Sequence, residues 1–420
     1  MQRLAIIGTG IAGMSAAYFL KDHYDITVFE KNEYIGGHTN TVTVDHNGEQ
    51  VAFDTGFMVF NFQTYPLLVK LFKRLDVPIK KTDMSFSVQN KETGLEYTGS
   101  GINGLFAQRK NILRPSHYKF LLEIDRFNKM ANEIAELEDY ENISIGEFIK
   151  KYNFKHRMLE DYLIPMSSAV WSTPPEKMLD FSIYSLIRFF KNHGFLGLDT
   201  QYQWWTVVGG SFAYRDKLIS SFKHKIQVNQ AVEKISRVGD KCHLTFKSGL
   251  TEQFDKVIIA AHSDQAYTML SEPNSLEAEI LPHFKYQKNL ATIHTDKSVM
   301  PKNRLCWSSW NFRYNPSPDG KLLPSTIYYM NMLQGVSEKN DYFVSINGAE
   351  DVAKDKIIRQ IEYHHPIFDT KTFQLQNRFK ELNQKGPIHF VGAYQANGFH
   401  EDGIRSSFEL CRTLLGRDPL

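Results

Sequence analysis

Residues 4–13 read Leu-Ala-Ile-Ile-Gly-Thr-Gly-Ile-Ala-Gly, and this stretch decides the fold. The apolar run at its start predicts a buried strand, because glycines follow it at once. Gly8, Gly10 and Gly13 have the GxGxxG spacing. In that motif the first glycine permits a tight turn, the second lets the backbone approach a diphosphate, and the third lets the next helix lie close to the strand. The stretch therefore predicts the first half of a βαβ unit.

A carboxylate ends the second half of this unit. Residues 26–29 form another short apolar run, and Glu30 follows it, at the spacing of about 20 residues that the motif requires. A carboxylate there can accept hydrogen bonds from both hydroxyls of an adenosine ribose. The free N–H groups of the intervening helix, residues 11–21, would face a diphosphate. We therefore expect a dinucleotide site, with a glycine-rich turn that binds no ligand as the alternative.

Composition limits the classes of protein that fit. The chain has 420 residues, of which 42% are hydrophobic, which is enough for two or three interlocked domains with a large core. Its net charge of +2 provides no strong field for a nucleic acid, so we expect no nucleic-acid partner. Cys242, Cys306 and Cys411 are too scattered for a disulfide framework or a metal site. They fit a reducing compartment, and we expect a cytoplasmic protein.

No membrane-spanning segment is expected, but contact with a membrane surface stays open. The first strand begins at residue 3, which leaves no room for a signal peptide, and no run of 18 or more apolar residues occurs. Residues 184–198 mix phenylalanines with Arg188 and Lys191. A helix that faces the core is the favoured interpretation, and a helix on a membrane surface or at the mouth of a lipid channel is the alternative.

Two further motifs extend the pattern. Gly36 and Gly37 form a turn, residues 39–53 read as a hairpin, and residues 54–58 then read Asp-Thr-Gly-Phe-Met. Together with GxGxxG and Glu30, these motifs resemble the FAD-dependent amine oxidase superfamily. That superfamily includes monoamine and polyamine oxidases, protoporphyrinogen oxidase and phytoene desaturases. The resemblance covers nearly the whole chain.

The resemblance implies non-covalent FAD as the cofactor, no metal, and two groups of contacts. The first group would hold the ADP half, the diphosphate and the flavin ring, and consists of Gly8, Gly10, Ile11, Ala12, Gly13, Glu30, Lys31, Gly37, His38, Gly56, Phe57 and Met58. His38 stands where many relatives have an arginine. The second group lies later in the chain and consists of Val232, Gly392, Asp402, Gly403 and Ile404. In relatives the final helix points its N-terminus at the flavin, where it stabilises negative charge on the reduced ring.

The predicted fold class is α/β. A Rossmann-type FAD-binding domain of the glutathione-reductase-like class is interleaved with an α+β substrate domain. The FAD-binding domain is assigned to residues 1–84, 205–284 and 385–420, and the substrate domain to a mainly helical block, 85–204, and a sheet, 285–384. A helical cap with a purely structural role is the alternative for the helical block.

Three residues depart from the amine oxidases within that resemblance. Tyr394 stands where many relatives have an acidic residue near the ribityl chain, and Phe399 replaces a tyrosine of the aromatic cage. Asn289 replaces a lysine that is bridged by water to flavin N5. Ser407 also replaces a usual glycine in the last helix. The whole arrangement resembles a bacterial branch of predicted NAD/FAD-binding amine-oxidase-like proteins, which is often associated with lipid methyltransferases of the cyclopropane-fatty-acid-synthase type.

The expected function is that of an FAD-dependent oxidoreductase that removes hydride from an apolar substrate, a fatty-acyl or methylated lipid chain. His400 and Tyr394 are the candidate catalytic residues, with a role at the start of the helix as the alternative for His400. Three other functions remain as alternatives: an amine oxidase, a redox-neutral flavin isomerase or mutase, and a non-catalytic binding protein resembling Rab GDP-dissociation inhibitors. The adjacent His364 and His365 would point to opposite sides of an extended segment, so no metal site is expected there. The electron acceptor and the oligomeric state stay open.

Overall fold

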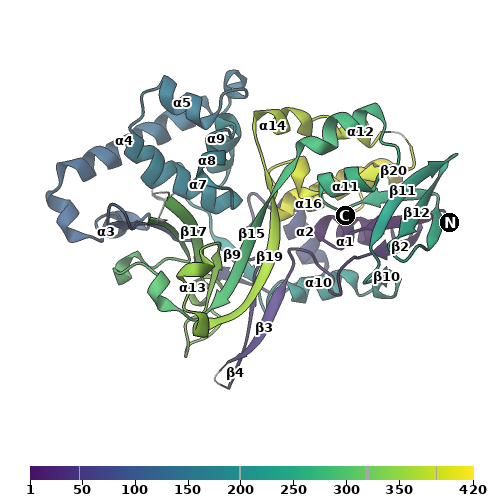
Figure 1. Ribbon diagram of the computed structural model, residues 1–420, viewed down its shortest axis with the longest axis horizontal. Coiled ribbons are helices and arrows are strands. Elements are labelled where there is room, and N and C mark those ends of the chain that lie inside the picture. The colour runs from purple at the N-terminus through teal and green to yellow at the C-terminus, as the bar shows by residue number, and fades with distance from the viewer. Residues whose placement is uncertain (47, 198–199, 317–321, 385) are drawn as a thin grey trace.

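A computed structural model describes residues 1–46, 48–197, 200–316, 322–384 and 386–420. Figure 1 shows three regions side by side. A parallel sheet with its helices lies at one end of the molecule, together with both chain termini. A large, mostly antiparallel sheet crosses the middle, and a group of helices forms the opposite end.

The parallel sheet assembles from three segments that are far apart in the sequence. Its strands, in spatial order, are β10 (Ile226–Gln227), β2 (Asp25–Phe29), β1 (Arg3–Ile7), β14 (Lys256–Ile259) and β20 (Ile388–Phe390). All neighbouring pairs are parallel. The central strands are buried on both faces, which explains why they read as continuous apolar runs. The sheet therefore combines strands from each of the three segments assigned to the FAD-binding domain.

Helices α1 (Ile11–Leu20) and α16 (His400–Leu415) pack against each other beside this sheet. A Cβ added to Gly403 would lie 2.7 Å from Cγ2 of Ile11, so a larger residue would displace the side chain of Ile11 at this crossing. Ser407 donates a hydrogen bond of 2.7 Å to the carbonyl oxygen of Ala12. Through this bond α16 accommodates a serine where it packs on α1.

The central sheet has seven strands. In spatial order they are β19 (Ile357–Ile367), β15 (Lys285–His294), β18 (Phe343–Ile346), β17 (Leu322–Tyr329), β16 (Trp310–Pro316), β7 (Phe86–Asn90) and β8 (Leu95–Thr98). The hairpin of β7 and β8 comes from the block 85–204, and β7 joins the sheet through a parallel pairing with β16. The mainly helical block therefore also contributes two strands to the sheet of the segment 285–384.

Three smaller sheets connect these parts. They are the hairpin β3 (Thr41–His46) and β4 (Glu49–Asp54), the sheet of β5 (Phe60–Asn61), β9 (Trp204–Val207) and β6 (Ile79–Thr82), and the meander β11 (Val232–Val238), β12 (Lys241–Phe246) and β13 (Thr251–Phe254). Strand β9 pairs with both β5 and β6. The end of the segment 1–84 and the start of the segment 205–284 therefore lie side by side.

The helical end of the molecule contains most of the block 85–204. Its helices are α3 (Gly101–Leu105), α4 (Pro115–Ile134), α5 (Ile145–Lys151), α6 (His156–Met158), α7 (Ile164–Trp171), α8 (Pro175–Met178) and α9 (Ile183–Asn192). Helix α9 buries six of its ten residues, including Leu186, Ile187 and Phe190. Helix α9 therefore faces the core. The sequence favoured this interpretation for the segment 184–198, of which residue 198 lies outside the described residues.

The remaining helices surround the two large sheets. They are α2 (Pro66–Arg74), α10 (Phe212–Ile219), α11 (Ser263–Met269), α12 (Ser275–Ile280), α13 (Met330–Gln334), α14 (Thr370–Gln376) and α15 (Phe379–Leu382). Among the described residues, no helix combines the length and the hydropathy that crossing a bilayer requires.

Asp54 joins three of these parts through one buried carboxylate. It accepts hydrogen bonds from Oγ1 of Thr41 (2.7 Å), from the backbone N–H and Oγ of Ser211 (2.8 and 2.6 Å), and from Nε2 of Gln334 (2.8 Å). Burial raises the pKa of Asp54, while these donors oppose the shift. The β3–β4 hairpin, the start of α10 and helix α13 are thereby held at one point.

A second buried carboxylate joins α16 to α2. The two carboxylate oxygens of Glu401 accept the N–H groups of Leu67 (3.1 Å) and Leu68 (3.0 Å), in the uncapped first turn of α2. The guanidinium of Arg405 lies 3.0 Å away. Burial nevertheless dominates and raises the pKa of Glu401 from 4.5 to about 7.

This shift predicts a measurable effect of pH on stability. Between about pH 4.5 and pH 7 the folded chain holds a proton on Glu401 that the unfolded chain has released, so this group lowers stability as the pH rises through that window. The ceiling of the effect is about 3 kcal/mol. Glu401→Gln should flatten the dependence of the urea midpoint on pH between pH 5 and pH 8. Glu409→Gln, an exposed residue on the same helix, is the control and should retain the slope of the parent. Equal slopes in the parent and Glu401→Gln would refute this assignment.

Candidate cofactor and substrate site

One cavity of about 860 Å³ lies where the three regions meet. Its walls include Gly8, Glu30, Ala260 and Gly392, which follow β1, β2, β14 and β20, so the cavity borders the carboxyl ends of the parallel strands. Ligands of open α/β sheets bind at this edge. The opposite walls come from the central sheet and from helices α7 and α9.

The cavity brings together most of the residues singled out in the sequence. Those that line it are Gly8, Gly10, Ile11, Ala12, Glu30, Lys31, Gly37, His38, Gly56, Phe57, Met58, Val232, Gly392, Tyr394, His400 and Gly403. Gly13, Asp402 and Ile404 do not line it. A Cβ on Gly13 would overlap the carbonyl oxygen of Gly8, so Gly13 serves the close packing of α1 on β1. Asp402 accepts the N–H of Phe399 (2.9 Å) at the start of α16, and Ile404 is buried in the core.

The N-terminus of α1 forms a cradle at one end of the cavity. Gly10 is the N-cap and has no side chain to occupy the free N–H groups of the first turn. Gly37 has a φ of +58°, and a Cβ there would lie 3.2 Å from Cα of Gly10, so both backbones stay close and bare. His38 lies next to Gly37 and is half-buried, and its buried Nε2 has no hydrogen-bond partner among the described residues. An uncapped helix N-terminus next to an unused donor or acceptor fits a diphosphate.

Glu30 is held firmly at the rim of this cradle. Its Oε2 accepts the N–H (3.0 Å) and the hydroxyl (2.6 Å) of Thr9, and its Oε1 accepts the N–H (3.0 Å) and the side-chain amide (2.9 Å) of Asn32. A carboxylate offers about four acceptor positions, so a ligand hydroxyl competes with these donors. Thr9 also accepts the N–H of Gly36 (3.1 Å), which ties the first glycine turn to the second.

The other end of the cavity is apolar and aromatic. Its walls include Met84, Phe86, Met166, Val170, Trp171, Phe189, Phe195, Trp204, Trp310, Tyr328 and Phe399. The rings of Phe189 and Phe399 stack at 4.9 Å, and the ring of Trp171 lies 4.7 Å from that of Phe189. Trp310, on β16, is one of the tryptophans of this wall. Trp307 does not line the cavity, because it packs against Tyr329 and Phe343.

Known proteins share this arrangement. Residues 11–324 match the model of the family described as flavin containing amine oxidoreductase. The chain belongs to that family. FAD is therefore its cofactor, and the bare cradle of α1 and the firmly held Glu30 fit the diphosphate and ribose of that cofactor.

Individual relatives are distant. A 15-cis-phytoene desaturase of Glycine max is 27% identical over 208 residues, which are 46% of this chain and 35% of the desaturase. The farnesylcysteine lyase of Arabidopsis thaliana is 22% identical over 319 residues, which are 67% of this chain and 61% of the lyase. The chain spans about half or less of the length of the phytoene desaturases it matches.

Solved structures share the fold over the whole chain. Putrescine oxidase bound to putrescine has a TM-score of 0.71 at 13% identity and covers 99% of both chains. A conjugated-linoleic-acid-producing fatty acid isomerase from P. acnes has a TM-score of 0.70 at 13% identity and covers 98% of both chains. At such low identity, these structures support the fold alone.

In this family member, His400 is held by structural contacts. Its ring stacks on that of Phe57 at 3.9 Å, and its Nε2 lies 2.6 Å from the hydroxyl of Tyr214. Burial lowers the pKa of His400 to about 3, so the ring is neutral and shares a hydrogen bond with Tyr214. This arrangement favours a role in positioning the start of α16 over proton transfer.

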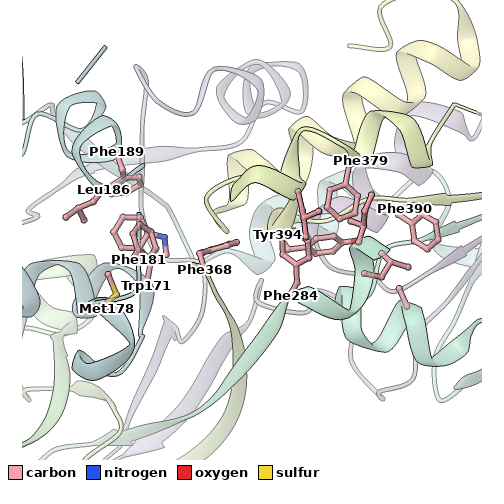
Figure 2. Close-up of a cluster of buried hydrophobic side chains, with 14 of the residues drawn as sticks. Trp171, Met178, Phe181, Leu186, Phe189, Phe284, Phe368, Phe379, Phe390 and Tyr394 are labelled. Carbon is pink, nitrogen blue, oxygen red and sulfur yellow. The ribbon is translucent and has the colours of Figure 1, made fainter. Parts of the chain in front are cut away.

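Tyr394 differs from His400, because its polar atom makes no hydrogen bond to a described residue. Its ring lies 5.7 Å from that of Phe284 and 5.3 Å from that of Phe379, within the aromatic cluster of Figure 2. Its hydroxyl has no hydrogen-bond partner among the described residues, although Tyr394 lines the cavity. Burial raises the pKa of Tyr394, so the phenol keeps its proton near neutral pH. The phenol of Tyr394 is therefore a buried, protonated group beside the cavity.

Histidines line the cavity more densely than the sequence suggested. His364 and His365, which are adjacent on β19, both line the cavity. Strand β19 runs along the rim, so consecutive residues reach it. The ring of His38 lies 5.1 Å from that of His365, and that of His262 lies 6.2 Å from that of His364. In the part of the chain that the structure describes, no cluster of three or more histidine, cysteine or acidic side chains has the geometry of a metal site.

Asn289 determines which nitrogen of His365 carries the proton. Nδ2 of Asn289 donates to the carbonyl oxygen of Ser172 (3.1 Å) and lies 2.8 Å from Nδ1 of His365. Its Oδ1 accepts from Nδ2 of Asn347 (2.9 Å). Because a carbonyl can only accept, the amide orientation is settled, and Nδ1 of His365 must be an acceptor. The neutral ring therefore carries its proton on Nε2. Burial lowers the pKa of His365 to about 3, which keeps the ring neutral.

We predict that His365 shows a single neutral tautomer, protonated on Nε2, from pH 5 to pH 8. Asn289→Ala should release Nδ1 and populate the second tautomer. ¹⁵N chemical shifts of histidine-labelled protein measure this, with His365→Gln to assign the signals. His294, which is buried at Ser345, is the internal control and should not change. A proton on Nδ1 of His365 in the parent would contradict the inferred network.

We also predict that Glu30→Gln and Glu30→Ala weaken FAD binding about 10-fold to 100-fold, because each removes charge-assisted hydrogen bonds. A fluorescence titration of the apoprotein with FAD measures the effect. Glu33→Gln, an exposed carboxylate of the same loop, is the matched control and should bind like the parent. Unchanged FAD occupancy in both Glu30 variants would remove Glu30 from the site.

Proposed function

We propose that this flavoprotein is an oxidoreductase that removes hydride from an apolar substrate, a fatty-acyl or methylated lipid chain, in a desaturation or oxidation. One observation carries the proposal: a single cavity contains both the cradle at α1 and the aromatic compartment at α7 and α9. A substrate in that compartment would lie next to the cofactor and away from water.

Bound FAD would supply the hydride acceptor, and the chain would supply position and exclusion of water. The aromatic walls around Phe189 and Phe399 would orient an extended apolar chain by contact alone. Tyr394 and His365 each offer a neutral proton donor to the cavity, and we propose them for proton transfer. His400 is assigned to positioning, because Tyr214 already occupies its Nε2.

The charges of the cavity disfavour an amine substrate. Its acidic lining residues are Glu30, Glu233, Asp264 and Glu362. None of them belongs to α7, α9 or the aromatic segment at Phe399, so the aromatic compartment has no carboxylate to pair with an ammonium group. The replacements at Asn289 and Phe399 point the same way. Among the relatives, the names phytoene desaturase and farnesylcysteine lyase refer to apolar prenyl chains, which supports a lipid-like substrate.

A redox-neutral isomerase remains the second candidate. The fatty acid isomerase from P. acnes shares the fold over 98% of both chains, and its name refers to an apolar chain. The two functions differ in electron balance. A desaturase reduces one flavin for each substrate that it converts when no acceptor is present, whereas an isomerase converts substrate without net reduction of the flavin.

We predict that anaerobic mixing with an unsaturated or methylated fatty-acyl lipid bleaches the flavin absorption of the holoprotein, and that primary amines do not. Val170→Phe, on the wall formed by α7, should slow bleaching about tenfold or more, because added bulk in a packed wall costs on the order of 1–3 kcal/mol. FAD content should not change. Val238→Phe, which places the same ring on the exposed strand β11, is the control. Bleaching by amines alone would overturn the proposal, and lipid conversion without bleaching would select the isomerase.

A further inference from the structure

The helical end of the molecule carries an exposed surface that the proposed function does not use. Helix α3, the turn Arg109–Leu113 and the first half of α4 expose five large apolar side chains. They are Ile102 (73% exposed), Ile112 (46%), Leu113 (87%), Tyr118 (45%) and Leu122 (67%). We call these residues, with the cations between them, the basic apolar ledge.

The charge of the ledge has one sign. Arg109, Lys110, Arg114 and Lys119 are exposed among the apolar side chains, and the sequence contains no acidic residue between Glu96 and Glu123. The guanidinium of Arg109 donates to Oδ1 of Asn103 and to the carbonyl oxygen of Phe106. Within the described residues, none of the four cations has a carboxylate within ion-pair distance. Their charge is therefore available to an anionic partner.

Hydrogen bonds and ring contacts hold the elements of the ledge together. His117 is buried, and its Nε2 lies 3.0 Å from the carbonyl oxygen of Leu105. The hydroxyl of Tyr118 donates to the carbonyl oxygen of Ile112 (2.9 Å), and its ring lies 5.4 Å from that of Phe106. These contacts hold α3, the turn and α4 in one arrangement. The apolar side chains are thus exposed in a folded structure.

The pattern suits a lipid surface better than a protein. Cores of protein interfaces are depleted in lysine, whereas surfaces that lie on membranes combine large apolar side chains with lysine and arginine. Cations next to a bilayer are attracted to anionic headgroups. In Figure 1 the ledge occupies the helical end, opposite the parallel sheet and both termini, so a flat partner can reach it.

We propose that the basic apolar ledge docks the protein on the surface of an anionic lipid bilayer, with Leu113 and Leu122 inserted below the headgroups. Helices α3 and α4, which carry part of the ledge, also contribute Leu105, Phe120 and Leu121 to an apolar cluster with Val88 and Tyr97. Phe86 packs against the same cluster and lines the cavity. The proposal stands whichever substrate the cavity takes.

Flotation of the FAD-loaded protein with vesicles tests the proposal. We expect binding to vesicles of phosphatidylcholine with phosphatidylserine, weaker binding at high salt, and at least tenfold weaker binding to phosphatidylcholine alone. Lys110→Glu with Arg114→Glu should reduce binding at least tenfold, and so should Leu113→Ser with Leu122→Ser. FAD content and thermal midpoint should remain those of the parent.

Matched controls distinguish vesicle binding through the ledge from nonspecific binding by other exposed residues. Lys223→Glu with Lys247→Glu reverses two exposed charges outside the ledge, and Val238→Ser with Leu250→Ser removes two exposed apolar side chains there. Both controls should bind as the parent does. Failure of the parent to float, or equal binding by either ledge variant, would overturn the proposal. Neither result would affect flavin bleaching by a lipid in detergent, so the proposed function is tested separately.

Discussion

The buried carboxylate of Asp54 is the constraint on which the site depends. A carboxylate in the interior is tolerated only where donors surround it, and Asp54 finds them on three separate segments. The same arrangement extends to the carbonyl oxygen of Met58, which accepts from Oγ1 of Thr206 (2.8 Å). The residues between Asp54 and Met58 line the cavity or lie next to it. The hydrogen bonds made by Asp54 and by the carbonyl oxygen of Met58 therefore fix the path of the backbone along this wall. One side chain thus couples the β3–β4 hairpin, the start of α10 and helix α13.

Close backbone contact is the second constraint. Gly13 lets α1 approach β1, and Gly403 lets α16 approach α1, although nearly the whole chain separates them. Gly13 lies outside the lining of the cavity, whereas Gly403 also lines it. At Ser407, the contact between α16 and α1 includes a serine instead of a glycine. Its small hydroxyl donates a hydrogen bond to the backbone of α1. The two ends of the chain are therefore brought together by packing, and the cavity forms between them.

Much of the cofactor end could be predicted from the sequence, because its motifs are local. GxGxxG, Glu30 and the turn at Gly37 are determined by backbone conformation and spacing, and these residues gather where the motifs imply. The histidines at the rim could not be found in this way. His364 and His365 lie on β19, whereas His262 is the residue before α11, and only the course of β19 along the cavity brings neighbouring residues to it. The tautomer of His365 depends on Ser172 and Asn347, which are remote in sequence and meet only in the fold.

The sequence by itself determined the βαβ unit, the family and the cofactor, since short-range spacing of glycines and one carboxylate is enough to specify a diphosphate cradle. Tertiary structure decided which polar groups are already engaged. It showed that His400 is occupied by Tyr214. Among the described residues, it also showed that the hydroxyl of Tyr394 has no hydrogen-bond partner and that the cations near Leu113 have no carboxylate partner. The physical reason is that hydrogen bonding, burial and exposure belong to pairs of groups, and most of these pairs are made by residues that the sequence keeps far apart.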